Sequence, residues 1–153
     1  MNASVTQNIQ DLSEIPAALD VSDRAERIKD ASRQIAYLDD DPDFARLIKI
    51  MGALLGHTVT LFHDPAEAED TVRLYPEAFD TFMSDYQMPL ADGIDVVQRV
   101  KRAHPHLDCA VISSDEWIVR RADVRALKIA TAIKPNCLRQ LELLLALIKA
   151  TSR

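Results

Sequence analysis

Acids, a hydroxyl and a lysine stand at four separated points of the sequence. They are the acidic run 39–41, Asp85, Ser113 and Lys134. Carboxylates that converge repel one another, and a hard divalent cation with oxygen ligands relieves that repulsion, so the acids predict Mg²⁺. A carboxylate beside Mg²⁺ is a nucleophile toward phosphorus, and a lysine and a hydroxyl suit the phosphoryl oxygens. Asp85 is therefore the candidate nucleophile.

Each of these residues also has a purely structural explanation. An aspartate that follows an apolar run, as Asp85 does, is more often a turn former or a helix cap than a reactive group. Lys134 by itself favours a salt bridge to the acids, and Ser113 by itself favours the N-cap of a helix. The chemical hypothesis thus depends on a fold that brings these residues together.

Short apolar segments lead to these points and predict five β-strands, at residues 35–38, 59–62, 81–85, 109–112 and 131–133. Apolar residues at helical spacing follow the strands, the first set being Phe44, Leu47, Ile48, Met51, Leu54 and Leu55. Asp64 and Pro65 predict the start of the second helix. Alternating strands and helices predict an α/β fold, a three-layer sandwich with a parallel sheet between two layers of helices.

Four of the five predicted strands end in a group that suits one shared site. Their ends carry the run 39–41, Asp85, the pair Ser113-Ser114 and Lys134. In an open parallel sheet, ligands bind beyond the carboxyl ends of the strands. The sequence therefore predicts that these groups surround a single site.

The composition limits the size and the partners of the protein. The chain has 153 residues and a formal net charge of −6. We expect one domain at 34–153 after a flexible polar tail at 1–33, in which residues 21–28 predict a short helix. Without a basic patch, nucleic acid is not an expected partner. No apolar run is long enough for a membrane span and no signal peptide is visible, so we expect a cytoplasmic protein.

The two cysteines, Cys109 and Cys137, lack the spacing of metal ligands and have no histidine partners nearby. Both are predicted to be buried, reduced thiols.

The sequence resembles the receiver domains of two-component response regulators, the CheY-like family, from about residue 35 to 150. The matching motifs are Leu38-Asp39-Asp40-Asp41-Pro42, Asp85-Tyr86-Gln87-Met88-Pro89 with Asp92-Gly93, Ile112-Ser113-Ser114, and Lys134-Pro135. The resemblance implies a flavodoxin-like fold with strand order 2-1-3-4-5.

The resemblance also implies a role for each residue of the site. Asp85 would accept a phosphoryl group from a phosphohistidine of a histidine kinase or a histidine phosphotransfer protein. The protein ligands of Mg²⁺ would be Asp39, Asp40, Asp85 and the backbone carbonyl of Gln87, with Asp40 nearer the ion than Asp39. Ser113 and Lys134 would meet the phosphoryl oxygens. Gln87 and Asp115 would flank the path of the water that later removes the group.

Three positions depart from the family pattern. Thr131 stands where receivers usually carry Tyr or Phe, the pair Leu127-Lys128 replaces Gly-Ala, and Asn136 replaces the Phe after Lys-Pro. These changes leave the acceptor site whole but remove the usual aromatic switch. A receiver that is never phosphorylated and serves as a constitutive dimerisation or partner-binding module is therefore one alternative.

A phosphohydrolase of the haloacid-dehalogenase kind is a second alternative. Such enzymes also use an aspartate, Mg²⁺, a serine and a lysine on a parallel sheet. Their nucleophile lies on the first strand, however, in an Asp-x-Asp-x-Thr/Val pattern, and the run from Asp39 to Asp43 fails at its last position.

Only residues 151–153 follow the last predicted helix. We therefore expect a stand-alone receiver, a phosphoacceptor rather than an enzyme, that acts by phosphoryl relay or by docking on another protein. The downstream protein stays unidentified, and a homodimer is left open. Trp117 should lie at the junction of the fourth strand and its helix, either as a partly buried packing residue or as a reporter of the site.

Overall fold

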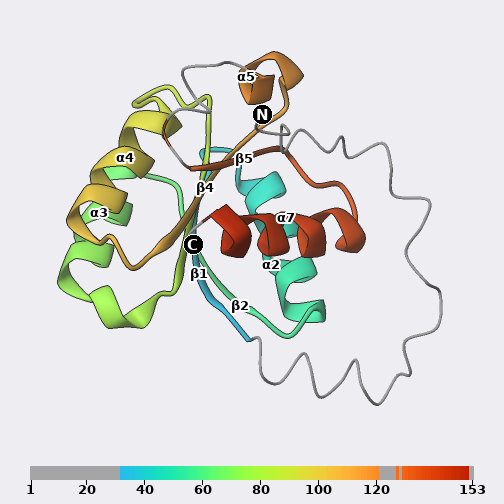
Figure 1. Cartoon of the computed structure of the whole chain (residues 1–153), viewed down its shortest axis with the longest axis horizontal. Helices are drawn as coiled ribbons and strands as arrows, with labels where there is room; N and C mark the ends of the chain where they lie inside the picture. Colours follow the sequence, from blue (N-terminus) through green and yellow to red (C-terminus); the bar gives the residue numbers. More distant parts are fainter. Residues whose placement is uncertain (1–31, 121–126, 128, 152–153) are drawn as a thin grey trace, which may run out of the picture. The chain divides into compact units, whose positions relative to one another are not determined.

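The computed structural model of the protein describes residues 32–120, 127 and 129–151 (Figure 1). The predicted tail at 1–33, with its short helix, lies outside these residues apart from Ser32 and Arg33. The helix predicted after the fourth strand is described over Glu116–Arg120 as α5, and residues 121–126 lie outside the description.

Five parallel strands form one sheet in the order β2-β1-β3-β4-β5, which confirms the predicted topology. The strands are β1 (Gln34–Leu38), β2 (Thr58–Phe62), β3 (Thr81–Asp85), β4 (Asp108–Ser113) and β5 (Ala130–Ile133). β1 and β3 are neighbours, and Leu38 pairs with Ser84. The residues that follow β1 and the last residue of β3 therefore meet at one edge of the sheet.

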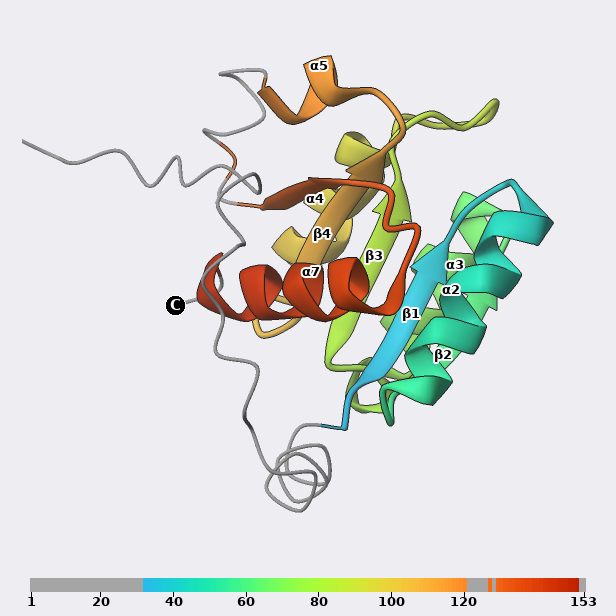
Figure 2. The same ribbon diagram turned by 90° about the vertical axis from the view of Figure 1, so that its right-hand side faces the viewer.

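Helices lie on both faces of the sheet, as predicted (Figures 1 and 2). The helices α2 (Pro42–Leu54) and α7 (Leu138–Thr151) pack on one face, and α3 (Pro65–Leu74) and α4 (Gly93–Ala103) pack on the other. The short helix α5 contacts β4 and β5. None of the helices in the described part of the chain has the length and apolar character of a membrane span.

Aspartate side chains decide where three of these helices begin. Asp41, Asp64 and Asp92 precede α2, α3 and α4, and each accepts backbone N–H bonds from the first turn. These bonds satisfy donors that have no partner inside the helix. The predicted N-cap at Asp64 is confirmed. Asp41 is likewise engaged as a cap, which separates its role from that of the two acids before it.

Buried side chains alternate along β1 between the two cores. Ile35 and Tyr37 face α2 and α7, whereas Ala36 and Leu38 face α3 and α4. The alternation follows from the two-residue period of a strand, and a central parallel strand is covered on both faces. Tyr37 thus reaches the core as a fully buried side chain.

One prediction about burial is wrong, because Cys137 is exposed in the loop before α7 while Cys109 is buried. Both are free thiols. Leu47 and Leu54, which share the apolar periodicity of α2, are 39% and 68% exposed. The apolar stripe of α2 is therefore wider than the surface that the sheet and α7 cover.

Candidate functional site

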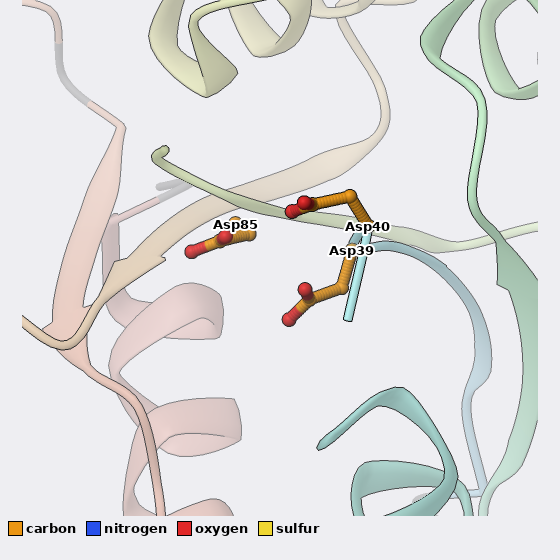
Figure 3. A group of neighbouring side chains, drawn as sticks. All are labelled: Asp39, Asp40 and Asp85. Atoms are coloured by element: carbon orange, nitrogen blue, oxygen red, sulfur yellow. The ribbon is translucent and has the colours of Figure 1, made fainter. Parts of the chain in front are cut away.

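Three carboxylates converge where β1 and β3 end (Figure 3). Asp39 and Asp40 follow β1, and Asp85 is the last residue of β3. Oxygen atoms of the three side chains all lie within 4.8 Å of one another. Asp39 and Asp85 are buried, whereas Asp40 is exposed. The cluster predicted from the strand ends is therefore present, with one acid facing solvent.

Asp39 is held by three hydrogen-bond donors. The Tyr37 hydroxyl donates to Asp39 Oδ2 over 2.5 Å, and Lys134 Nζ donates to the same oxygen over 2.9 Å. The backbone N–H of Asp41 donates to Asp39 Oδ1 over 2.9 Å. A buried carboxylate needs such partners, because burial removes the water that would otherwise solvate its charge.

Asp85 is nearly as buried, at 6% exposure, but has fewer partners. Lys134 Nζ lies 3.3 Å from its Oδ1. Burial, reinforced by the charge of Asp39, raises the pKa of Asp85 to about 6, although Lys134 acts in the opposite direction. Carboxylates whose pKa is raised in this way are typical of functional sites.

Lys134 joins the two buried acids. Besides its contacts with Asp39 and Asp85, its ammonium group lies 4.5 Å from the centroid of the Phe44 ring, at the start of α2. Burial lowers the pKa of Lys134, but the hydrogen bond to Asp39 and the charges of both acids outweigh burial and raise it. The salt bridge that Lys134 alone would favour therefore exists, and it lies inside the acidic cluster.

Ser113 lies at the predicted strand end but does not contact the acids. Its Oγ accepts the backbone N–H of Asp115 over 3.0 Å, and its carbonyl accepts the N–H of Lys134 over 2.9 Å. Asp85 pairs with Ile112 on the neighbouring strand, so Ser113 is one residue beyond the acceptor along β4. Its hydroxyl thus completes a local turn beside the cluster.

The other residues predicted for the site or its switch are Gln87, Asp115, Thr131 and Trp117. Gln87 is exposed in the loop after β3, in a bridge with Asp92. Asp115 is exposed, and its Oδ1 accepts the N–H of Trp117 over 2.9 Å. Thr131 is half-buried on β5, opposite Val111 of β4. Trp117 is 68% exposed in α5, so it is more exposed than a partly buried packing residue.

Sequence patterns did not assign Tyr37, Phe44 or His63 to the site. In the structure Tyr37 and His63 contact Asp39, and Phe44 contacts Lys134. His63 Nδ1 lies 2.8 Å from the backbone carbonyl of Asp39, which can only accept, so Nδ1 carries the proton of that bond. Tyr37 did leave a signal, because residues two apart on a strand share a face. A tyrosine two positions before a buried acid is placed to meet that acid.

The chain belongs to the family of response regulator receiver domains, whose pattern matches residues 35–142. This family comprises signalling modules of two-component systems. The match therefore favours a receiver domain over a phosphohydrolase of the haloacid-dehalogenase kind. The response regulator protein PilR of Pseudomonas aeruginosa is 31% identical over 84 residues, which are 54% of this chain and 18% of that protein. The chain therefore spans less than a fifth of that relative.

A second relative is matched over most of its own length. The response regulator receiver protein CpdR of Brucella abortus is 30% identical over 110 residues, 71% of this chain and 90% of that protein. Among solved structures, the chemotaxis protein CheY4 of Vibrio cholerae has a TM-score of 0.67 at 18% identity, over 77% of this chain and 99% of that one. This likeness shows the CheY-like, flavodoxin-type fold.

Proposed function

We propose that this chain is a phosphoacceptor of a two-component phosphorelay, in which Asp85 takes a phosphoryl group from a phosphohistidine. The donor is a histidine kinase or a histidine phosphotransfer protein. The observation that carries the proposal is the position of Asp85 at the end of β3, 3.3 Å from Lys134 Nζ and within 4.8 Å of the oxygens of Asp39 and Asp40. One cation and two further acids are thereby assembled around the Asp85 carboxylate.

The donor set fits Mg²⁺. Three carboxylates supply hard oxygen ligands, and the exposed Asp40 leaves room for the waters that Mg²⁺ retains. Asp39, Asp40 and Asp85 are the side-chain ligands in this proposal, with Asp40 nearer the ion than Asp39, and the backbone carbonyl of Gln87 is a further ligand. When bound, the ion neutralises charge on the carboxylates and on the phosphoryl oxygens.

The transfer itself is a displacement at phosphorus. A carboxylate oxygen of Asp85 attacks the phosphorus atom, the P–N bond of the phosphohistidine breaks, and its electron pair stays on the imidazole nitrogen. The products are an acyl phosphate on Asp85 and a free histidine side chain. Lys134 is placed to leave Asp39 and to donate to the new phosphoryl oxygens, and Ser113 reaches them once its hydroxyl turns away from the Asp115 N–H.

The signal then passes to another protein through surfaces near the site. Trp117 of α5 lies four residues after Ser113, so a movement of Ser113 toward the phosphoryl group shifts the start of α5. Thr131 has no aromatic ring to carry that movement along β5. We therefore propose that the conformational change stays near β4 and α5, and that it alters a docking surface for a partner protein more than it alters self-association.

The test is incubation of the protein with acetyl phosphate and Mg²⁺, followed by intact mass spectrometry. The wild type should gain the mass of one phosphoryl group, and Asp85→Asn should not, because an amide oxygen is a poor nucleophile in a side chain of nearly unchanged shape. Asp43→Asn is the matched control, since this exposed aspartate lies at the start of α2 outside the cluster and should leave labelling intact.

Equal labelling of wild type and Asp85→Asn would refute Asp85 as the acceptor. Absence of labelling in the folded wild type, under conditions that label another receiver, would favour the constitutive dimerisation or partner-binding module.

A further inference from the structure

Tyr37 is a fully buried tyrosine in the middle of the central strand β1. It pairs with Leu61 on one side and Met83 on the other, and its ring packs in the core beneath α2 and α7. Its hydroxyl donates to Asp39 Oδ2. The Asp39 carboxylate can only accept, so the Tyr37 hydroxyl is the donor of this hydrogen bond.

Tyr37 and Lys134 share one acceptor atom. Both donate to Asp39 Oδ2, over 2.5 Å and 2.9 Å, while the Asp41 N–H occupies one lone pair of Oδ1. A carboxylate oxygen has two lone pairs, so Oδ2 is saturated and Oδ1 keeps one free position.

The two donors differ in their freedom to move. Lys134 carries its ammonium group on a flexible chain and also lies 3.3 Å from Asp85. Its ammonium group can therefore leave Asp39 and bind a different oxygen acceptor nearby. The Tyr37 hydroxyl is fixed by a ring that is fully buried among packed side chains. If Lys134 were the only side-chain donor, its departure would leave a buried carboxylate with a single backbone N–H.

We propose that Tyr37 is a positioning residue of the acidic cluster, whose hydroxyl holds Asp39 in place when Lys134 leaves Asp39 for the phosphoryl group. The inference rests on the proposed function and deepens it. It assigns the two side-chain donors of Asp39 to different stages of phosphorylation. Lys134 binds Asp39 before phosphorylation, and Tyr37 binds it throughout. The geometry of Asp39 toward the metal is therefore the same with Lys134 in either position.

A double-mutant cycle on Mg²⁺ binding tests this proposal without any phosphoryl donor. Four proteins are compared by titration calorimetry with Mg²⁺ alone: wild type, Tyr37→Phe, Lys134→Met and the double variant. Tyr37→Phe keeps the buried ring, and Lys134→Met keeps the chain length without the charge. Tyr75→Phe is the control, because it removes the hydroxyl of a tyrosine that is 62% exposed after α3.

The two substitutions should be strongly non-additive. With Lys134 present, Tyr37→Phe should change the Mg²⁺ affinity by less than about twofold, since Lys134 and Asp41 still hold Asp39. With Lys134→Met, the same change should weaken Mg²⁺ binding about tenfold, because loss of the groups that orient a metal ligand has effects of this size. A residue that only fills space would change the affinity equally in both backgrounds, and that result would overturn the proposal.

A second measurement uses only the wild-type protein, so it does not depend on whether a variant folds. In wild-type protein with labelled tyrosine, the Tyr37 hydroxyl proton should exchange slowly with water and should persist after acetyl phosphate and Mg²⁺ are added. Loss of this protected proton on phosphorylation would overturn the proposal.

The outcomes separate this inference from the proposed function. Additive effects on Mg²⁺ binding would refute the role of Tyr37 and leave Asp85 as the acceptor. Labelling of Asp85→Asn by acetyl phosphate would refute Asp85 as the phosphoacceptor, whatever the double-mutant cycle on Mg²⁺ binding shows. A wild-type protein that binds no Mg²⁺ would refute the metal site and the role of Tyr37 together.

Discussion

The backbone carbonyl of Asp85 approaches Gly93 so closely that it leaves no room for a β-carbon at position 93. A β-carbon on Gly93 would be 1.9 Å from Asp85 O, far inside contact distance. The loop after β3 therefore returns against the acceptor strand so closely that only glycine fits at the first residue of α4.

Gly93→Ala should consequently disturb both stability and the acceptor. The added methyl group must push back a backbone atom, which cannot rotate away, so we expect a loss of about 1–3 kcal/mol of unfolding free energy. Labelling by acetyl phosphate should also slow, because Asp85 moves with its own carbonyl. Thermal unfolding and the labelling rate measure the two effects.

Gly52→Ala is the control for Gly93→Ala. Its β-carbon would lie 2.5 Å from Cγ2 of the Val59 side chain, in the core and away from the acids. This variant should leave the labelling rate of the folded protein unchanged even where stability changes. A Gly93→Ala protein that labels at the wild-type rate would show that the close approach does not position Asp85.

The stability of the metal-free protein should depend on pH through Asp85. Its pKa rises from 3.8 to about 6, chiefly because it is buried and also because Asp39 is charged. The folded chain then binds this proton more tightly than the unfolded chain does. The contribution of Asp85 to stability is therefore greatest below about pH 4 and falls as the pH rises toward 6.

Asp85→Asn removes this dependence. Relative to wild type, the variant should gain unfolding free energy between about pH 4.5 and pH 7.5, by up to about 2 kcal/mol. Denaturant titrations at the two pH values measure the gain. It should shrink when Mg²⁺ is present, because the cation offsets the repulsion among the acids. A difference between variant and wild type that stays constant with pH would show that Asp85 titrates alike in both states.

The neighbouring acids Asp40 and Asp41 should have separable roles. Asp40 is exposed and belongs to the cluster, so Asp40→Ala should weaken Mg²⁺ binding strongly. Asp41 caps α2, so Asp41→Ala should cost about 1 kcal/mol of stability and change the Mg²⁺ affinity little. Calorimetry with Mg²⁺ and thermal unfolding measure both. The reverse order of Mg²⁺ affinities would move the metal site by one residue.

The indole of Trp117 should report phosphorylation. The tryptophan is largely exposed, and its backbone N–H is bound to Asp115, whose own N–H is bound to Ser113. Movement of Ser113 toward a phosphoryl group is transmitted through this short chain of hydrogen bonds. Tryptophan emission should therefore change on addition of acetyl phosphate and Mg²⁺ in wild type and stay constant in Asp85→Asn.

Size-exclusion chromatography of the same samples tests how far the change extends. With Thr131 in place of an aromatic residue, we expect little change in self-association. A constant Trp117 signal in protein whose phosphorylation is confirmed by mass would contradict a working switch at α5. A phosphorylation-dependent dimer would show instead that coupling through β5 and α7 survives without the aromatic ring.

The order of strands and helices was predictable from the sequence because its signals are local. Asp64 followed by Pro65 starts a helix through bonds within one turn, and each apolar run before an acid predicts a strand with its acid at the end. Parallel strands point the same way, so their last residues share one edge of the sheet. Asp39, Asp40 and Asp85 converge because β1 and β3 are also neighbours in the sheet.

Only the tertiary structure decided how the acids are shared among their partners. The sequence predicted that Lys134 and Ser113 belong to one site with the acids. In the structure Lys134 contacts both Asp39 and Asp85, Asp39 more closely, and the Ser113 hydroxyl accepts the backbone N–H of Asp115. Tyr37 reaches Asp39 because a core packed on both faces fixes its ring, and Gly93 is required because the loop after β3 returns to Asp85. Such contacts depend on how the strands, loops and helices pack against one another. Residue type and spacing place a group at an edge of the sheet, whereas packing selects the atom it touches.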